Sequence, residues 1–167
     1  MREEPKDLWV YEREAFAEGY QAVCGVDEAG RGPLAGPVCA AAVILPAGLV
    51  IDGLNDSKKL TDKKRRELYD VITQNAVSYG IAMASEREID EINILQATYE
   101  AMRYAVEDLD VVPDLLLNDA VTIPLIPIRQ VGIVKGDARS LSIAAASIME
   151  KVTRDRMMVE YAELYPE

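Results

Sequence analysis

An apolar stretch that ends in two adjacent carboxylates is the feature that most restricts the fold of this chain. Residues 22–28 have the composition of a buried strand, which Asp27 and Glu28 close. Glycines and prolines follow at once, before a second apolar run at 37–45, so the backbone must turn tightly between two neighbouring strands. Acids at such a strand end need a cation, a base or hydrogen bonds, because an unpaired buried charge is costly. The alternative for this pair is an acidic strand end that caps a turn.

Helical and extended patterns alternate along the remaining chain. We expect helices over 7–19, over 61–76 with Thr61 as N-cap, from the capping-box pair Ser85 and Glu88, over 94–109, and from Asp137 onward. Further strands are expected over 77–84, 114–119 and 130–135. In the second helix, Leu68, Val71 and Ile72 are predicted to face the core, and in the first the apolar members are Leu8, Val10, Tyr11 and Phe16. The pattern predicts an α/β fold, with a mixed β-sheet flanked by α-helices in a single domain.

The apolar runs and the two cysteines indicate a protein that is not exported. The longest uninterrupted apolar run, 38–45, is too short to cross a bilayer, and the first residues lack an apolar signal region. Cys24 and Cys39 lie in strand-like runs without metal-ligand spacing, which predicts buried, reduced thiols. A cytoplasmic location is therefore expected.

The charge distribution matters more than the net charge of −11 and the pI near 4.5, which by themselves argue against a nucleic-acid partner. Basic residues gather in two places. The first cluster contains Lys58, Lys59, Lys63, Lys64, Arg65 and Arg66, and the second contains Arg139, Lys151, Arg154 and Arg156. Either cluster is a candidate phosphate-binding patch, and a solvated helix face is the alternative.

Four acids stand at strand ends or helix starts: Asp27, Glu28, Asp119 and Asp137. One side of the predicted sheet could gather all four, although Asp119 could form a turn and Asp137 could cap the helix behind it. The chain has no histidine, which removes the commonest general base and the usual zinc ligand. A carboxylate cluster favours Mg²⁺ or Mn²⁺, and its mutual repulsion predicts dependence on a metal.

Four separated blocks of this sequence resemble the bacterial ribonuclease HII family, in that family's order. They span residues 23–37, 55–60, 90–98 and 135–148, the last followed by 151–155. The resemblance implies a ribonuclease H-like sheet. It also implies a type-2 ribonuclease H catalytic domain over 20–167, after an N-terminal helical extension over 1–19.

The resemblance further implies an endoribonuclease that hydrolyses the RNA strand of RNA/DNA hybrids and single ribonucleotides embedded in duplex DNA. Two ions of Mg²⁺ or Mn²⁺ would act in catalysis and leave 5′-phosphate and 3′-hydroxyl ends. The family's catalytic and metal-binding acids align with Asp27, Glu28, Asp119 and Asp137. The substrate-binding candidates are Gly30, Arg31, Gly32, Lys58, Lys59, Ser147 and Lys151. The glycine loop would read the ribose 2′-hydroxyl, which distinguishes RNA from DNA.

Three departures from the family pattern qualify this interpretation. Ala120 follows Asp119 where many bacterial members have glycine, and Glu150 replaces a small residue near the proposed site. The chain also ends at Glu167, where members continue through a basic segment whose tyrosine stacks at the RNA to DNA junction. We therefore expect a chain that lacks this C-terminal segment and discriminates the junction poorly.

Partners and alternative functions follow from the same residues. The expected partners are RNA/DNA hybrids and ribonucleotide-containing DNA, with no membrane; a sliding clamp is a further candidate, and a monomer is expected. One alternative is a module that binds hybrids but cleaves poorly, and another is a resolvase-like or transposase-like nuclease core, which the glycine loop disfavours. A dinucleotide cofactor is disfavoured because the spacing of Gly30, Gly32 and Gly36 is one residue too long and because Pro33 and Pro37 oppose a helix there.

Overall fold

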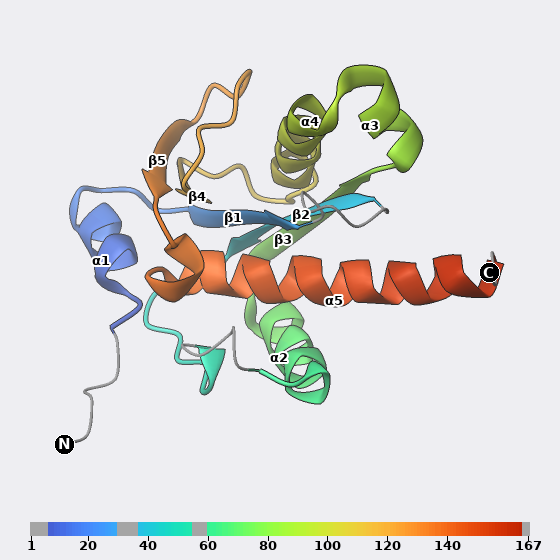
Figure 1. The fold of residues 1–167 in the computed structure, drawn as a ribbon. Helices are drawn as coiled ribbons and strands as arrows, with labels where there is room; N and C mark the ends of the chain where they lie inside the picture. The colour runs from blue at the N-terminus through green and yellow to red at the C-terminus, as the bar shows by residue number, and fades with distance from the viewer. Residues whose placement is uncertain (1–6, 30–36, 55–59, 165–167) are drawn as a thin grey trace.

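The computed structural model describes residues 7–29, 37–54 and 60–164 of the chain. Helices and strands are interspersed along these residues (Figure 1). The elements are α1 (Val10–Ala17), β1 (Val23–Ala29), β2 (Val38–Ile44), α2 (Asp62–Asn75), β3 (Ser78–Ala84), α3 (Glu86–Ile92), α4 (Ile94–Glu107), β4 (Leu115–Asp119), β5 (Arg129–Ile133), the 3₁₀ helix η2 (Gly136–Ala138) and α5 (Leu141–Leu164).

The strands of the described residues form one five-stranded mixed sheet in the order β3-β2-β1-β4-β5. β1 pairs antiparallel with β2 and parallel with β4, while β4 pairs parallel with β5. The predicted mixed sheet flanked by helices is thereby confirmed. Because β1 and β4 are parallel neighbours, with Val26 opposite Asn118, their carboxyl ends lie at the same edge of the sheet.

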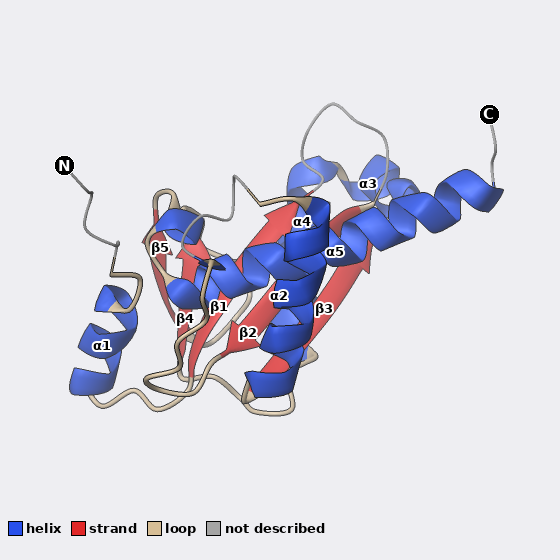
Figure 2. Cartoon of the chain, turned by 90° about the horizontal axis from the view of Figure 1, so that it is seen from below, coloured by secondary structure: helices blue, strands red, loops and turns tan. Residues whose placement is uncertain are grey.

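Helices cover both faces of the sheet. In Figures 1 and 2, α3 and α4 lie on one side, and α5 and α2 lie on the other. One apolar core packs α4 against alternate residues of β1 and β2, and a second packs α5 and α2 against the opposite faces of the strands. β2 is wholly buried, as expected of a strand covered on both faces.

Glycine in β1 sets the distance between α5 and the sheet. A Cβ atom at Gly25 would lie 2.2 Å from the carbonyl carbon of Ser142 and 2.4 Å from the amide nitrogen of Ile143. Only a residue without a side chain permits backbones to approach this closely. The start of α5 is therefore pressed onto the centre of the sheet.

Two of the predicted helix starts, at Thr61 and Ser85, are confirmed by capping contacts. The hydroxyl of Thr61 accepts a hydrogen bond from the amide of Lys64 at 3.1 Å, and that of Ser85 accepts one from the amide of Glu88 at 3.1 Å. Each side chain satisfies an amide that has no partner within the helix. Both cysteines are buried free thiols, as predicted.

Several local predictions are wrong. Val71 is 38% exposed, so the core side of α2 is formed by Leu68 and Ile72 without it. The helix predicted to begin at residue 7 begins at Val10, because Asp7 lies before the helix and accepts a hydrogen bond from the amide of Trp9. Val10 itself is exposed. Asp137 lies in η2, and the long helix begins only at Leu141. No helix among the described residues is long and apolar enough to span a bilayer.

Candidate metal-binding site at the carboxyl edge of the sheet

Asp27 and Asp119 lie at the same edge and on the same face of the sheet. Val23 of β1 and Leu117 of β4 share a core cluster with Ile143 of α5, and side chains alternate between faces along a strand. Asp27 lies four residues after Val23, and Asp119 lies two residues after Leu117. Both acids therefore point to the same face of the sheet as these apolar residues, toward α5. Asp27 is only 6% exposed, and the adjacent Glu28 is half-buried.

Asp137 reaches the same edge through the turn after β5. It is 8% exposed, and the preceding amide, that of Gly136, donates a hydrogen bond to Oδ1 of Asp119 at 2.9 Å. A Cβ at Gly136 would lie 2.5 Å from a methyl carbon of Ile143 and 3.5 Å from the Cα of Asp119, so the turn packs closely against both. The hydrogen bond orients the Asp119 carboxylate and fixes the turn that carries Asp137.

A fifth acid, Glu150, enters the site from α5. It is 1% exposed, and its Oε2 accepts no hydrogen bond within the described residues. Ser142, Ala146 and Glu150 follow one another at four-residue spacing, so they share the face that α5 turns to the sheet.

Burial and mutual repulsion shift the ionisation of these acids. Burial contributes most to raising the pKa of Asp27 well above its usual range, and the charges of Glu28 and Asp119 add to it, followed by that of Asp137. Burial also raises the pKa of Glu150 to about 10, and the charge of Asp27 adds to this shift. Lys151 and Arg154 oppose the shift of Glu150. The site thus has an excess of negative charge that a cation would relieve.

The donor set suits a hard divalent cation. Carboxylate oxygens are the ligands that Mg²⁺ and Mn²⁺ prefer, and no ion pair joins Asp27, Asp119 or Asp137 to a basic side chain within residues 7–29, 37–54 and 60–164. Across those same residues, no three acids or cysteines already converge in a way that would hold an ion. The acids are close enough for Glu28, Asp119 and Asp137 to raise the pKa of the buried Asp27, and side-chain adjustment would be needed for them to share a metal.

Two of the seven predicted substrate-binding residues, Ser147 and Lys151, lie within the described residues. Gly30, Arg31, Gly32, Lys58 and Lys59 lie outside the described residues. Ser147 is wholly buried, with a hydroxyl that has no hydrogen-bond partner in the described part of the chain. Lys151 is half-buried next to Glu150, at the acidic site.

Comparison with known proteins identifies the family. The model of the ribonuclease HII family matches residues 24–167, which include all five acids described above. The chain belongs to the ribonuclease HII family. This membership leaves the resolvase or transposase interpretation without support.

Individual ribonucleases of the family agree with the match. The chain is 61% identical to the ribonuclease HII of Lachnoclostridium phytofermentans over 158 residues, covering 95% of this chain and 62% of that protein. Its fold matches the ribonuclease H2 of Pyrococcus horikoshii with a TM-score of 0.78 at 28% identity, over 88% of this chain and 78% of that one. It also matches a structure of the PCNA:RNase HII complex from Archaeoglobus fulgidus, with a TM-score of 0.72 at 25% identity, over 88% and 79% of the two chains. The chain spans about 62% of the length of the first curated relatives it matches.

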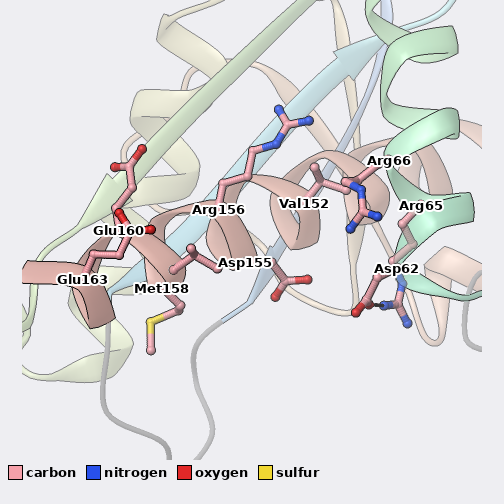
Figure 3. Close-up of a pocket in the computed structure, with 10 residues that line it drawn as sticks. Asp62, Arg65, Arg66, Val152, Asp155, Arg156, Met158, Glu160 and Glu163 are labelled. Atoms are coloured by element: carbon pink, nitrogen blue, oxygen red, sulfur yellow. Dashed lines mark hydrogen bonds and ion pairs between the residues drawn. The ribbon is translucent and has the colours of Figure 1, made fainter. Parts of the chain in front are cut away.

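One pocket of this ribonuclease HII family member contains none of the acids of the candidate metal-binding site in its lining. It has a volume of about 750 Å³ and lies between α2 and α5 (Figure 3). Arg65 and Arg66 of α2 and Arg156 of α5 line it, together with acids that include Asp62. Arg65 already bonds to Asp62 at 2.8 Å, and Arg156 stacks on Tyr69. Part of the predicted basic clusters is thus used in contacts within the protein.

The sequence interpretation missed Glu12, a wholly buried carboxylate on α1. Its Oε2 accepts hydrogen bonds from the hydroxyl of Ser140 and the amide of Ser142, both at 2.9 Å. The available signal was its position: Glu12 lies four residues after Leu8 and three before Ala15, both buried, and so occupies the inner face of α1.

Proposed function

We propose that this chain is a metal-dependent endonuclease that hydrolyses the RNA strand of RNA/DNA hybrids and single ribonucleotides embedded in duplex DNA. Family membership supports the RNA-directed activity. The observation that supports the chemistry most directly is the gathering of Asp27, Asp119 and Asp137 at one edge of the sheet, where burial, with the charges of the neighbouring acids adding to it, raises the pKa of Asp27. We further propose cleavage to 5′-phosphate and 3′-hydroxyl ends by a cytoplasmic monomer.

The acids would hold Mg²⁺ or Mn²⁺, two ions during catalysis. When bound, such ions lower the pKa of an attacking water and neutralise charge at the scissile phosphate. Asp27 and Glu28 from β1, Asp119 from β4 and Asp137 from η2 would supply the oxygen ligands. The hydrogen bond from Gly136 holds one of these carboxylates in a fixed orientation before any ligand arrives.

Other residues would bind the nucleic acid. Lys151 stands next to the acidic site and is placed to attract a phosphate, and Lys58 and Lys59 are proposed to contact the backbone as well. Gly30, Arg31 and Gly32 follow β1 directly in sequence, so a ribose that they contact would lie beside Asp27 and Glu28. Their backbone groups would recognise the 2′-hydroxyl.

The direct test uses a labelled DNA duplex that contains one ribonucleotide. Incubation with Mg²⁺ or Mn²⁺ should let water attack the scissile phosphorus and break its bond to the 3′ oxygen, leaving a 3′-hydroxyl on one product and a 5′-phosphate on the other. An all-DNA duplex and the Asp27→Asn protein are the controls, and neither should give product. Cleavage of the all-DNA duplex, or products unaffected by chelation of the metal, would refute the proposal.

Binding without cleavage is the second candidate function. It is favoured by the finding that no three acids in the described ranges converge on a metal position. A gel-shift measurement on the same duplex would distinguish it, because a binding module would retain the ribonucleotide-containing duplex intact in the presence of either metal.

A sliding clamp is a proposed partner. The support is the similarity to the archaeal ribonuclease HII that was solved with PCNA. Co-elution of this chain with a bacterial sliding clamp in size-exclusion chromatography is the expected result, and separate elution at micromolar concentrations would count against it.

A further inference from the structure

Glu12 joins α1 to the start of α5. Its buried carboxylate accepts hydrogen bonds from the Ser140 hydroxyl and the Ser142 amide, and its other oxygen has no partner among the described residues. A second tie comes from the carbonyl of Leu8, which accepts the Leu141 amide at 2.9 Å. The amides at a helix start have no partner within the helix, and the helix dipole favours a negative charge there. In Figure 1, α1 lies beside the beginning of α5.

Further hydrogen bonds connect Ser140 to Asp119 at the candidate metal-binding site. The amide of Ser140 donates to the carbonyl of Gly136 at 2.8 Å, and the amide of Gly136 donates to Oδ1 of Asp119 at 2.9 Å. The first bond closes the turn that contains Asp137, and the second ties that turn to the end of β4. A continuous hydrogen-bonded chain therefore runs from Glu12 through Ser140 and Gly136 to Asp119.

The turn depends on such support because its backbone is strained. Lys135, which directly precedes η2, has a φ of 55°, in the left-handed region that residues with a side chain rarely adopt. Strained conformations of this kind persist where the surrounding contacts enforce them. Ser140 supplies one such contact from the far end of the turn, and Glu12 holds Ser140 in place.

We propose that Glu12 is a positioning residue for the metal-binding acids Asp119 and Asp137. The inference rests on the proposed function, since it assigns to Glu12 the orientation of acids that would bind the metal. Loss of the Glu12 carboxylate leaves the Ser140 hydroxyl without its acceptor and lets the turn carrying Asp137 move. Partners that orient ligands in this way typically change metal affinity about 10- to 100-fold when removed.

Calorimetric titration with Mn²⁺ in the absence of nucleic acid tests the inference. The proteins are wild type, Glu12→Ala, Glu12→Gln and the control Glu14→Ala, which removes an exposed carboxylate from the same helix. Circular dichroism first selects a temperature at which each protein is folded. We expect Glu12→Ala to bind Mn²⁺ at least about 10-fold more weakly. Glu12→Gln keeps an acceptor oxygen and should restore most of the affinity, while Glu14→Ala should match wild type.

The outcomes separate this inference from the proposed function. Wild-type affinity in folded Glu12→Ala would overturn the positioning role and leave the proposed function intact. If wild type itself neither binds Mn²⁺ nor cleaves, the proposed function falls, and this inference with it. Should Glu12→Ala not fold, Ser140→Ala decides the question, because it removes the hydroxyl that donates to Glu12 and that also accepts the Ile143 amide at 3.3 Å. Unchanged Mn²⁺ affinity in that variant would overturn the inference.

Discussion

Replacement of Glu150 by glutamine should make the metal-free protein more stable at alkaline pH. Glu150 is buried beside Asp27, and its pKa is raised from 4.5 to about 10. The folded state therefore favours the protonated side chain. The stabilisation associated with this group is complete below about pH 4.5 and is lost as the pH rises toward 10. A glutamine has no proton to lose and lacks this dependence.

The size of the effect follows from the shift. From the ordinary value of 4.5 to about pH 8 is about 3.5 pH units, and each unit corresponds to about 1.4 kcal/mol. At about pH 8 the wild-type protein should thus lose on the order of 5 kcal/mol relative to its own stability in acid, through this one group. The Glu150→Gln variant should avoid that loss, apart from a constant offset from the amide that replaces the carboxyl.

The assay is urea denaturation followed by circular dichroism, in chelator, at about pH 5, 6.5 and 8. The difference in unfolding free energy between Glu150→Gln and wild type should grow with each step in pH. Glu163→Gln, an exposed acid on the same helix, is the matched control and should show no such trend. A difference between Glu150→Gln and wild type that stays constant across this range would refute the reasoning, because a constant offset reports packing and not ionisation.

Three further changes test the geometry around the site. Gly25→Ala should prevent folding or cost more than about 4 kcal/mol, since its Cβ would lie 2.2 Å from the backbone of Ser142; a urea midpoint near that of wild type would show that α5 can move away. Ala120→Gly should raise stability by about 0.5–1 kcal/mol, because Ala120 has a φ of 64°, and a lower melting temperature would contradict this. Asp27→Asn should reduce cleavage by orders of magnitude and yet raise metal-free stability above about pH 4, because the raised pKa of Asp27 means that its charge is unfavourable in the folded state. Cleavage by Asp27→Asn at the wild-type rate would exclude a metal role for this carboxylate.

Local sequence signals predicted the secondary structure well where the cause is local. Thr61 and Ser85 start helices because their hydroxyls accept amide hydrogen bonds three residues later, a contact that depends on neighbours in sequence alone. The buried run of β2 needed only its apolar composition to be recognised. The prediction of Asp137 as a helix start was wrong, because α5 begins at Leu141 behind Ser140, whose hydroxyl accepts a hydrogen bond from the Ile143 amide at 3.3 Å. Leu8 and Glu12, residues of a distant segment, accept hydrogen bonds from the amides of Leu141 and Ser142.

The features of the candidate site likewise divide into those with local causes and those with tertiary causes. The sequence indicated that Asp27 lies near the end of one strand and Asp119 at the end of another, because an apolar run that stops at an acid is visible along the chain. Only the tertiary structure decided that the two strands are parallel neighbours and that the Gly136 amide donates a hydrogen bond to Asp119. It also decided that Glu150 approaches from α5, the helix that Asp27 and Asp119 face. Those facts depend on strand order and helix packing, and they set burial and charge repulsion. The ionisation of Asp27 is therefore a property of the folded chain, since its causes lie on separate elements that only folding brings together.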